Sequence, residues 1–147
     1  MRSKTRLIGV GSAALFLACF LGCQSDHAEH HEDHPAQVEH IDGSDIKKVT
    51  LTERAMQRID VQTTAVQADD RKESTWLKVP YSSLIYDPHG HTWVYTSPQA
   101  RTFVRESVDL DRVDGDWAYL KAGPAVGTQV ASVGVAELYG TEFTVGH

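Results

Sequence analysis

The residues best suited to chemistry in this sequence are histidines, and five of the eight lie between positions 27 and 40. Imidazole is a preferred ligand of late first-row metals such as zinc, nickel and copper, and carboxylates add negative charge and further ligands. The tract therefore supports an exchangeable site for zinc, nickel, cobalt or copper, and no tightly bound cofactor is expected. Its histidines are His27, His30, His31, His34 and His40, interleaved with Glu29, Glu32, Asp33 and Glu39.

The first four histidines of the tract recur at spacings i, i+3, i+4 and i+7. Residues at these spacings share one face of a helix, so a turn induced by metal would bring all four imidazoles together. Neutral imidazole is the form that binds metal, and we therefore expect affinity to fall below about pH 6.5. A plain polar spacer has the same composition, so the residue pattern alone fits both interpretations equally.

Two further histidines, His89 and His91, flank Gly90 in a segment with the composition of a turn. They form a weaker candidate metal site, and the simpler interpretation is a solvated hairpin loop. The sequence contains no nucleophile elbow, zinc-protease, P-loop or dinucleotide-binding motif. We therefore expect that the protein is not an enzyme.

The N-terminal residues have the pattern of a secretory signal. A basic segment containing Arg2, Lys4 and Arg6 precedes an apolar run over residues 7–21 that has no charge. This run is rather short for a membrane-spanning helix, which needs about 20 residues. We therefore expect residues 1–22 to be a signal that is removed on export.

The end of the signal resembles the lipobox of bacterial lipoproteins, because the small residue Gly22 precedes Cys23. The resemblance implies that Cys23 becomes an acylated N-terminus anchored in the membrane by its acyl chains; the alternative is an ordinary cleaved signal. Gln24 follows in place of the aspartate typical of inner-membrane retention, which favours the outer membrane. Cys19 would leave with the signal, so no free thiol would remain.

The mature chain is strongly acidic. Removing the three basic residues of the signal leaves 11 Lys and Arg against 20 Asp and Glu, a net charge of about −9 with neutral histidine. Such a surface repels nucleic acid and attracts cations. Nucleic acid is therefore excluded as a partner.

The mature chain divides into two parts by composition. Residues 23–46 form the first part, in which residues 24–45 have Val38 and Ile41 as their only sizeable apolar side chains, and no basic residue occurs between Arg6 and Lys47. Such a segment cannot bury enough apolar surface to offset its ordering entropy, so we expect a disordered tether. From Lys47 the composition is globular, and residues 47–147 are expected to form one domain.

Within this domain, short apolar runs separated by turn residues predict a small antiparallel β domain or barrel with one short helix. Thr50 to Glu53 have the capping-box form and mark a helix start, with apolar residues at helical spacing through Ile59. We expect a helical turn near residues 135–138 and a closing strand over residues 142–145. Trp76, Trp93 and Trp117 are expected to carry much of the core.

Two blocks of the sequence carry a further pattern. Residues 49–66 have the form V-x-L-T-x-x-x-x-x-x-I-x-V-x-T-x-x-V. Residues 79–147 contain V-P-x-x-x-L, T-W-V-Y, F-V-R-x-x-V and A-G-P-A-V-G-T-Q-V in that order. Both blocks resemble the periplasmic adaptor (membrane fusion) subunits of RND-type efflux systems, nearest to the heavy-metal branch, over about four-fifths of the mature chain.

The resemblance implies the membrane-proximal β domain of these adaptors. In a full adaptor the coiled-coil hairpin, lipoyl and barrel domains lie between the two blocks, whereas here about a dozen residues separate Val66 from Val79. The resemblance thus implies an accessory of a metal-efflux complex, with an RND-type transporter or a full-length adaptor as partner. Heavy-metal adaptors often begin with histidine-rich segments, which favours metal binding by the tract. The alternative is a protein-docking module with the tract as spacer.

Overall fold

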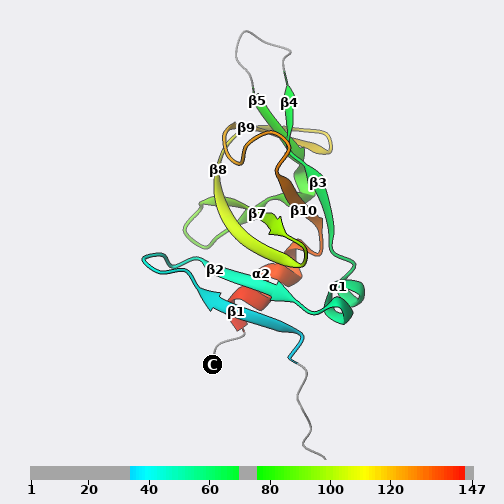
Figure 1. The fold of residues 1–147 in the computed structure, drawn as a ribbon. Helices are drawn as coiled ribbons and strands as arrows, with labels where there is room; N and C mark the ends of the chain where they lie inside the picture. The colour runs from blue at the N-terminus through cyan, green and yellow to red at the C-terminus, as the bar shows by residue number, and fades with distance from the viewer. Residues whose placement is uncertain (1–33, 70–75, 145–147) are drawn as a thin grey trace, which may run out of the picture. The chain divides into compact units, whose positions relative to one another are not determined.

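A computed structural model describes residues 34–69 and 76–144, and these residues form a mainly antiparallel β-sheet with two α-helices (Figure 1). The expected fold class is therefore confirmed, with a second helix in addition. The strands are β1 (Ala36–His40), β2 (Lys47–Leu51), β3 (Gln62–Ala65), β4 (Gln67–Asp69), β5 (Trp76–Pro80), β6 (Ile85–Tyr86), β7 (Thr92–Gln99), β8 (Thr102–Asp114), β9 (Trp117–Ala122) and β10 (Gln129–Val133). The helices are α1 (Glu53–Ile59) and α2 (Val135–Thr144), with a short 3-10 helix at Tyr81–Ser83.

The long strand β8 connects the parts of the sheet. Its first residues pair with β2 on one side and with β7 on the other, and its later residues pair with β9. The main strand order is β3-β10-β7-β8-β9-β5-β4, with β1 added beside β2 and β6 beside β7. Register shifts near Leu110 interrupt the β8–β9 ladder, and irregularities of this kind bend a strand.

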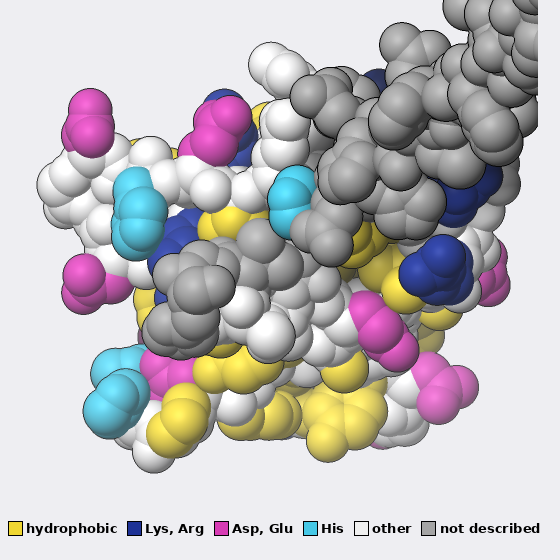
Figure 2. Space-filling model, turned by 90° about the horizontal axis from the view of Figure 1, so that it is seen from below, with side chains coloured by type: hydrophobic (Ala, Val, Ile, Leu, Met, Phe, Trp, Pro, Cys, Tyr) yellow, Lys and Arg dark blue, Asp and Glu magenta, His cyan; other side chains and the backbone are white. Residues whose placement is uncertain are grey.

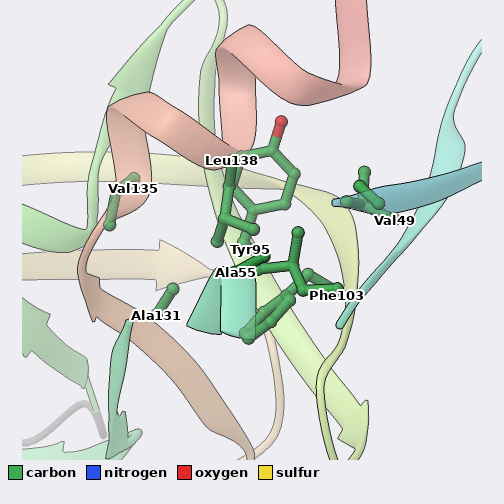
Figure 3. Packing of buried hydrophobic residues seen from close by; sticks show 9 residues of the cluster. Val49, Ala55, Tyr95, Phe103, Ala131, Val135 and Leu138 are labelled. Carbon is green, nitrogen blue, oxygen red and sulfur yellow. The ribbon is translucent and has the colours of Figure 1, made fainter. Parts of the chain in front are cut away.

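The core consists of two hydrophobic clusters. The larger lies between α2, α1 and the strands β1, β2, β7 and β8, and Figure 3 shows Leu138 of α2 packed over Tyr95. The second contains Val66, Val79, Val94, Leu120 and Val130, among other residues. The expectation that the tryptophans carry the core is wrong, because all three are only half-buried. Tyr95 and Phe103 are the large aromatic residues that are fully buried.

Helix α1 begins close to the expected position. Thr52 is the N-cap, and its hydroxyl accepts a hydrogen bond from the backbone N–H of Ala55 at 3.2 Å. The capping-box pattern predicted Thr50 as the N-cap, so the observed cap lies two residues after the predicted one. Asp60 ends the helix in the left-handed conformation, with φ of 48°.

The C-terminal segment differs from the expectation. Residues 142–144 belong to helix α2, so the predicted closing strand is wrong. Leu138 and Glu142 are both fully buried, and their spacing of four places them on one helix face. The sequence did not reveal this helix face, because Glu142 occupies a core position where an apolar residue is expected.

The start of the domain also differs from the expectation. The tether was predicted to extend through residue 46, but Ala36–His40 form strand β1, which pairs antiparallel with β2. Ala36 is buried, Val38 packs against the larger cluster, and the residues between and after them are exposed. Two small apolar residues in alternation were enough to add a strand because β2 supplies a ready partner edge.

Candidate functional site

The predicted ligands lie in two regions. Cys23, His27, His30 and His31 lie outside the described residues. His34 lies two residues before the first residue of β1 and His40 ends the strand, and both histidines are exposed. Within residues 34–69 and 76–144, no group of three or more His, Cys, Asp or Glu side chains could hold a metal ion.

The histidine tract joins the fold at a defined point. The backbone carbonyl of Pro35 accepts a hydrogen bond from Thr52 N–H at 3.0 Å, at the start of α1. From there β1 runs along β2, where Glu39 and Lys48 form an exposed ion pair with 2.6 Å between Oε2 and Nζ. Position 34 is therefore one residue from a fixed point, and His40 is fixed by the strand itself.

The turn between β6 and β7 contains the other two candidate ligands, and it is organised by Asp87. The Oδ1 atom of Asp87 accepts hydrogen bonds from the backbone N–H groups of His89 and His91, both at 2.9 Å. Its Oδ2 accepts a hydrogen bond from Trp93 Nε1 at 3.1 Å and lies 3.1 Å from His91 Nδ1. Gly90 has φ of 86°, as the predicted turn requires.

The carboxylate of Asp87 is largely covered, with its side chain 8% exposed. Desolvation raises the pKa of Asp87, but the hydrogen bonds from His91, Trp93 and His89 outweigh it and hold the pKa well below the usual aspartate range. The group therefore remains a carboxylate at every pH near neutrality. Sequence reasoning missed Asp87, although an aspartate that begins a turn is a recognised signal for such bonds.

The lowered pKa of Asp87 gives a testable pH dependence. Because the folded-state pKa lies below the unfolded value, its contribution to the free energy of unfolding is present above about pH 4 and is lost as the pH falls further. We expect Asp87→Asn to remove this component, so that stability falls less steeply between pH 4 and pH 2 in urea titrations. Asp114→Asn, at an exposed hairpin position, is the control and should leave the slope unchanged. Equal slopes in all three proteins would contradict this.

A buried ion pair lies beneath the same turn. Arg105 is 7% exposed and Glu142 is fully buried, with 3.3 Å between Arg105 Nη2 and Glu142 Oε1. The hydroxyl of Tyr95 donates a hydrogen bond to the other carboxylate oxygen, and Lys47 N–H donates to Oε1 at 3.4 Å. Burial, followed by the bond to Glu142, raises the pKa of Tyr95 far above its usual value, so the hydroxyl remains a donor.

The guanidinium of Arg105 is also held between aromatic rings. It lies 4.3 Å from the ring centre of Trp93 and 5.2 Å from that of Phe143. These residues line a pocket of about 440 Å³ together with Asp45, His89, Tyr139 and others. Arg105 belongs to the F-V-R-x-x-V pattern and Glu142 to the segment predicted as a closing strand, and nothing in the sequence indicated that the two residues meet.

The face seen in Figure 2 carries hydrophobic side chains along one edge. Two tyrosines of the region before β7 are among the large exposed apolar residues: Tyr81 is 47% exposed and Tyr86 is 51% exposed. A shallow pocket nearby is lined by apolar residues of β6 and α2, including Ile85, Val135 and Tyr139. No helix in the described part of the chain is long and apolar enough to cross a membrane.

Comparison with solved structures finds a likeness in the solution structure that encompasses the N-terminal metal-binding site and the membrane-proximal domain of SilB from Cupriavidus metallidurans CH34. This chain is similar in fold to part of that structure. The match has 22% sequence identity and a TM-score of 0.44, and it covers 52% of this chain and 42% of that structure. No protein-family model and no curated protein matches the chain.

Proposed function

We propose that the protein is a lipid-anchored, adaptor-like accessory of an RND-type efflux system for heavy-metal cations, and that its histidine tract binds a divalent ion in the periplasm. The observation that carries the proposal is the direct connection between the tract and the β domain. Pro35 accepts a hydrogen bond from Thr52, the N-cap of α1, and His40 ends β1. An ion held by the tract would therefore remain beside the domain. Anchoring through Cys23 would keep both at the membrane, and Gln24 after the cysteine favours the outer membrane.

The sequence pattern of efflux adaptors supplies the second support. Both pattern blocks belong to the antiparallel sheet, and β2 of the first block pairs with β8 of the second. The two blocks therefore form one domain without the segments that separate them in full adaptors. A domain of this kind is suited to contact an RND-type transporter or a full-length adaptor.

The second candidate function is a protein-docking module in which the tract is only a spacer. The exposed Tyr81 and Tyr86, beside the shallow apolar pocket of β6 and α2, favour it. Clustered aromatic side chains are common at the centres of protein interfaces. Under this alternative, the tract can be replaced without loss of function.

Isothermal titration with Zn²⁺, Ni²⁺, Co²⁺ and Cu²⁺ at neutral pH tests the metal proposal. The protein is residues 24–147, which include every described residue and neither cysteine. The matched variant carries glutamine at all five tract histidines and keeps the length and polarity of the tract. We expect the parent chain to bind at micromolar or tighter levels through sites that the variant lacks. Identical isotherms would overturn metal binding by the tract.

Complementation in cells then separates the two functions. The same five-glutamine variant should lose metal tolerance while its co-purification with the efflux partner is unchanged. If tolerance is retained and Tyr86→Ser instead abolishes co-purification, the docking alternative is correct. Substitution is preferred to deletion, because part of the predicted tether is a strand of the fold.

A further inference from the structure

We propose that the turn between β6 and β7 is a second metal site, in which His89 and His91 bind one late first-row divalent ion and Asp87 orients His91. This site takes its ligands from the folded domain and does not depend on the histidine tract.

The first step of the argument is that the backbone of the turn is already fixed. Asp87 Oδ1 accepts hydrogen bonds from the N–H groups of both histidines, and Asp87 N–H donates to the carbonyl of His91 at 3.0 Å. Gly90 N–H closes the turn by donating to the carbonyl of Asp87, also at 3.0 Å. A flexible site loses conformational entropy when it binds an ion, because binding orders its chain. This turn is already ordered, so that entropic cost is small.

The second step concerns the ring of His91. Its Nδ1 lies 3.1 Å from Asp87 Oδ2, and Trp93 Nε1 donates to the same oxygen. In neutral His91 this contact places the hydrogen on Nδ1 and leaves the lone pair of Nε2 for a metal. A carboxylate that accepts from one imidazole nitrogen while the other binds the ion is a recurrent arrangement in metal sites.

The third step is the separation of the two rings. Their centroids are 6.3 Å apart and their planes are inclined by 44°. Two imidazoles that share an ion at about 2.0–2.1 Å from each nitrogen have centroids roughly 5–6 Å apart. Both side chains are exposed, His91 to 66%, so a small rotation of His89 brings the rings into range.

The charge around the turn favours a cation. Asp45 lines the pocket on the His89 side, and Asp109 lines the hollow on the His91 side. Arg105 is the only lysine or arginine among the described residues that line these two hollows, and its charge is balanced by Glu142. With two nitrogen ligands and open positions for water, affinity should follow the order Co²⁺ below Ni²⁺ below Cu²⁺, with Zn²⁺ below Cu²⁺.

The test uses residues 24–147 with glutamine at the five tract histidines, so that only the turn and His147 can contribute imidazole. Titration with Cu²⁺ is followed by calorimetry and by quenching of tryptophan fluorescence, since the Trp93 ring lies 6.4 Å from that of His91. We expect one equivalent to bind. In this background His89→Gln and His91→Gln should each weaken binding at least tenfold, and His147→Gln is the matched control with no effect. Absence of binding, or equal affinities in the three variants, would overturn the proposal.

Asp87→Asn tests the orienting role, because it keeps both imidazoles. We expect binding weaker by about 10–100-fold, as for other partners that orient metal ligands. Circular dichroism and melting identify any loss of the turn. Nitrogen NMR of the protein that keeps Asp87 gives a second measurement, with Zn²⁺ as a diamagnetic ion. On binding, the chemical shift of His91 Nε2 should change and that of His91 Nδ1 should change little. The reverse pattern overturns the assignment of Asp87.

The two metal proposals fail separately. If the five-glutamine variant binds one equivalent with the same affinity as the parent, the tract proposal fails and the turn proposal is supported. If the parent binds metal and the variant binds none, the tract proposal is supported and the turn proposal fails.

Discussion

Replacing Glu142 by alanine should lower the free energy of unfolding by about 3–5 kcal/mol, because the change leaves the buried guanidinium of Arg105 without its carboxylate. Glu142 is fully buried and also accepts hydrogen bonds from Tyr95 and from Lys47 N–H. Urea unfolding at neutral pH, followed by circular dichroism, measures the change. Glu137→Ala on the exposed face of the same helix is the control, with an expected effect below about 1 kcal/mol.

A double substitution separates the charge from the packing at this position. Arg105→Met combined with Glu142→Leu removes both charges and keeps apolar volume. We expect it to be more stable than Glu142→Ala, since replacing a whole buried pair costs much less than removing one partner. If the double variant is as unstable as the single one, the cost arises from lost hydrogen bonds to Tyr95 and Lys47 and not from an unpaired charge.

Removing strand β1 should have the second large effect. A chain that begins at residue 43 lacks Ala36 and Val38, which cover the larger core cluster, and lacks the ladder with β2. We expect it to be at least about 2–4 kcal/mol less stable than residues 24–147, because apolar burial and the hydrogen bonds of the ladder are both lost. A chain that begins at residue 34 keeps β1 and should match the longer protein. Urea unfolding of the three proteins makes the comparison.

The result of this comparison affects every experiment on the tract. If residues 43–147 unfold at the same urea concentration as residues 24–147, β1 contributes nothing and the segment through residue 46 can be treated as a tether. If they are less stable, a deletion that extends past Pro35 would confuse loss of metal ligands with loss of folding. Substitution of the histidines avoids this problem because it leaves the strand and its pairing unchanged.

Local chemistry was sufficient for much of the fold. Short apolar runs separated by turn residues predicted an antiparallel sheet, and the turn before β7 was recognised from the composition around Gly90. The helix start near Thr52 was predicted to within two residues. These features depend on neighbours in sequence, through side-chain periodicity, caps and the backbone freedom of glycine, so the sequence alone can indicate them.

Features that depend on distant residues were decided by tertiary structure. Strand β1 exists because β2 offers an edge, and a polar segment with two small apolar residues gives little sign of it. Helix α2 continues through Glu142 because Arg105 and Tyr95, from two other strands, supply partners for its buried carboxylate. The sequence by itself determined where the histidines are concentrated, and it predicted metal binding there. Only the fold placed Asp87 against His91, because that contact requires the turn to close and hold both groups within hydrogen-bonding distance.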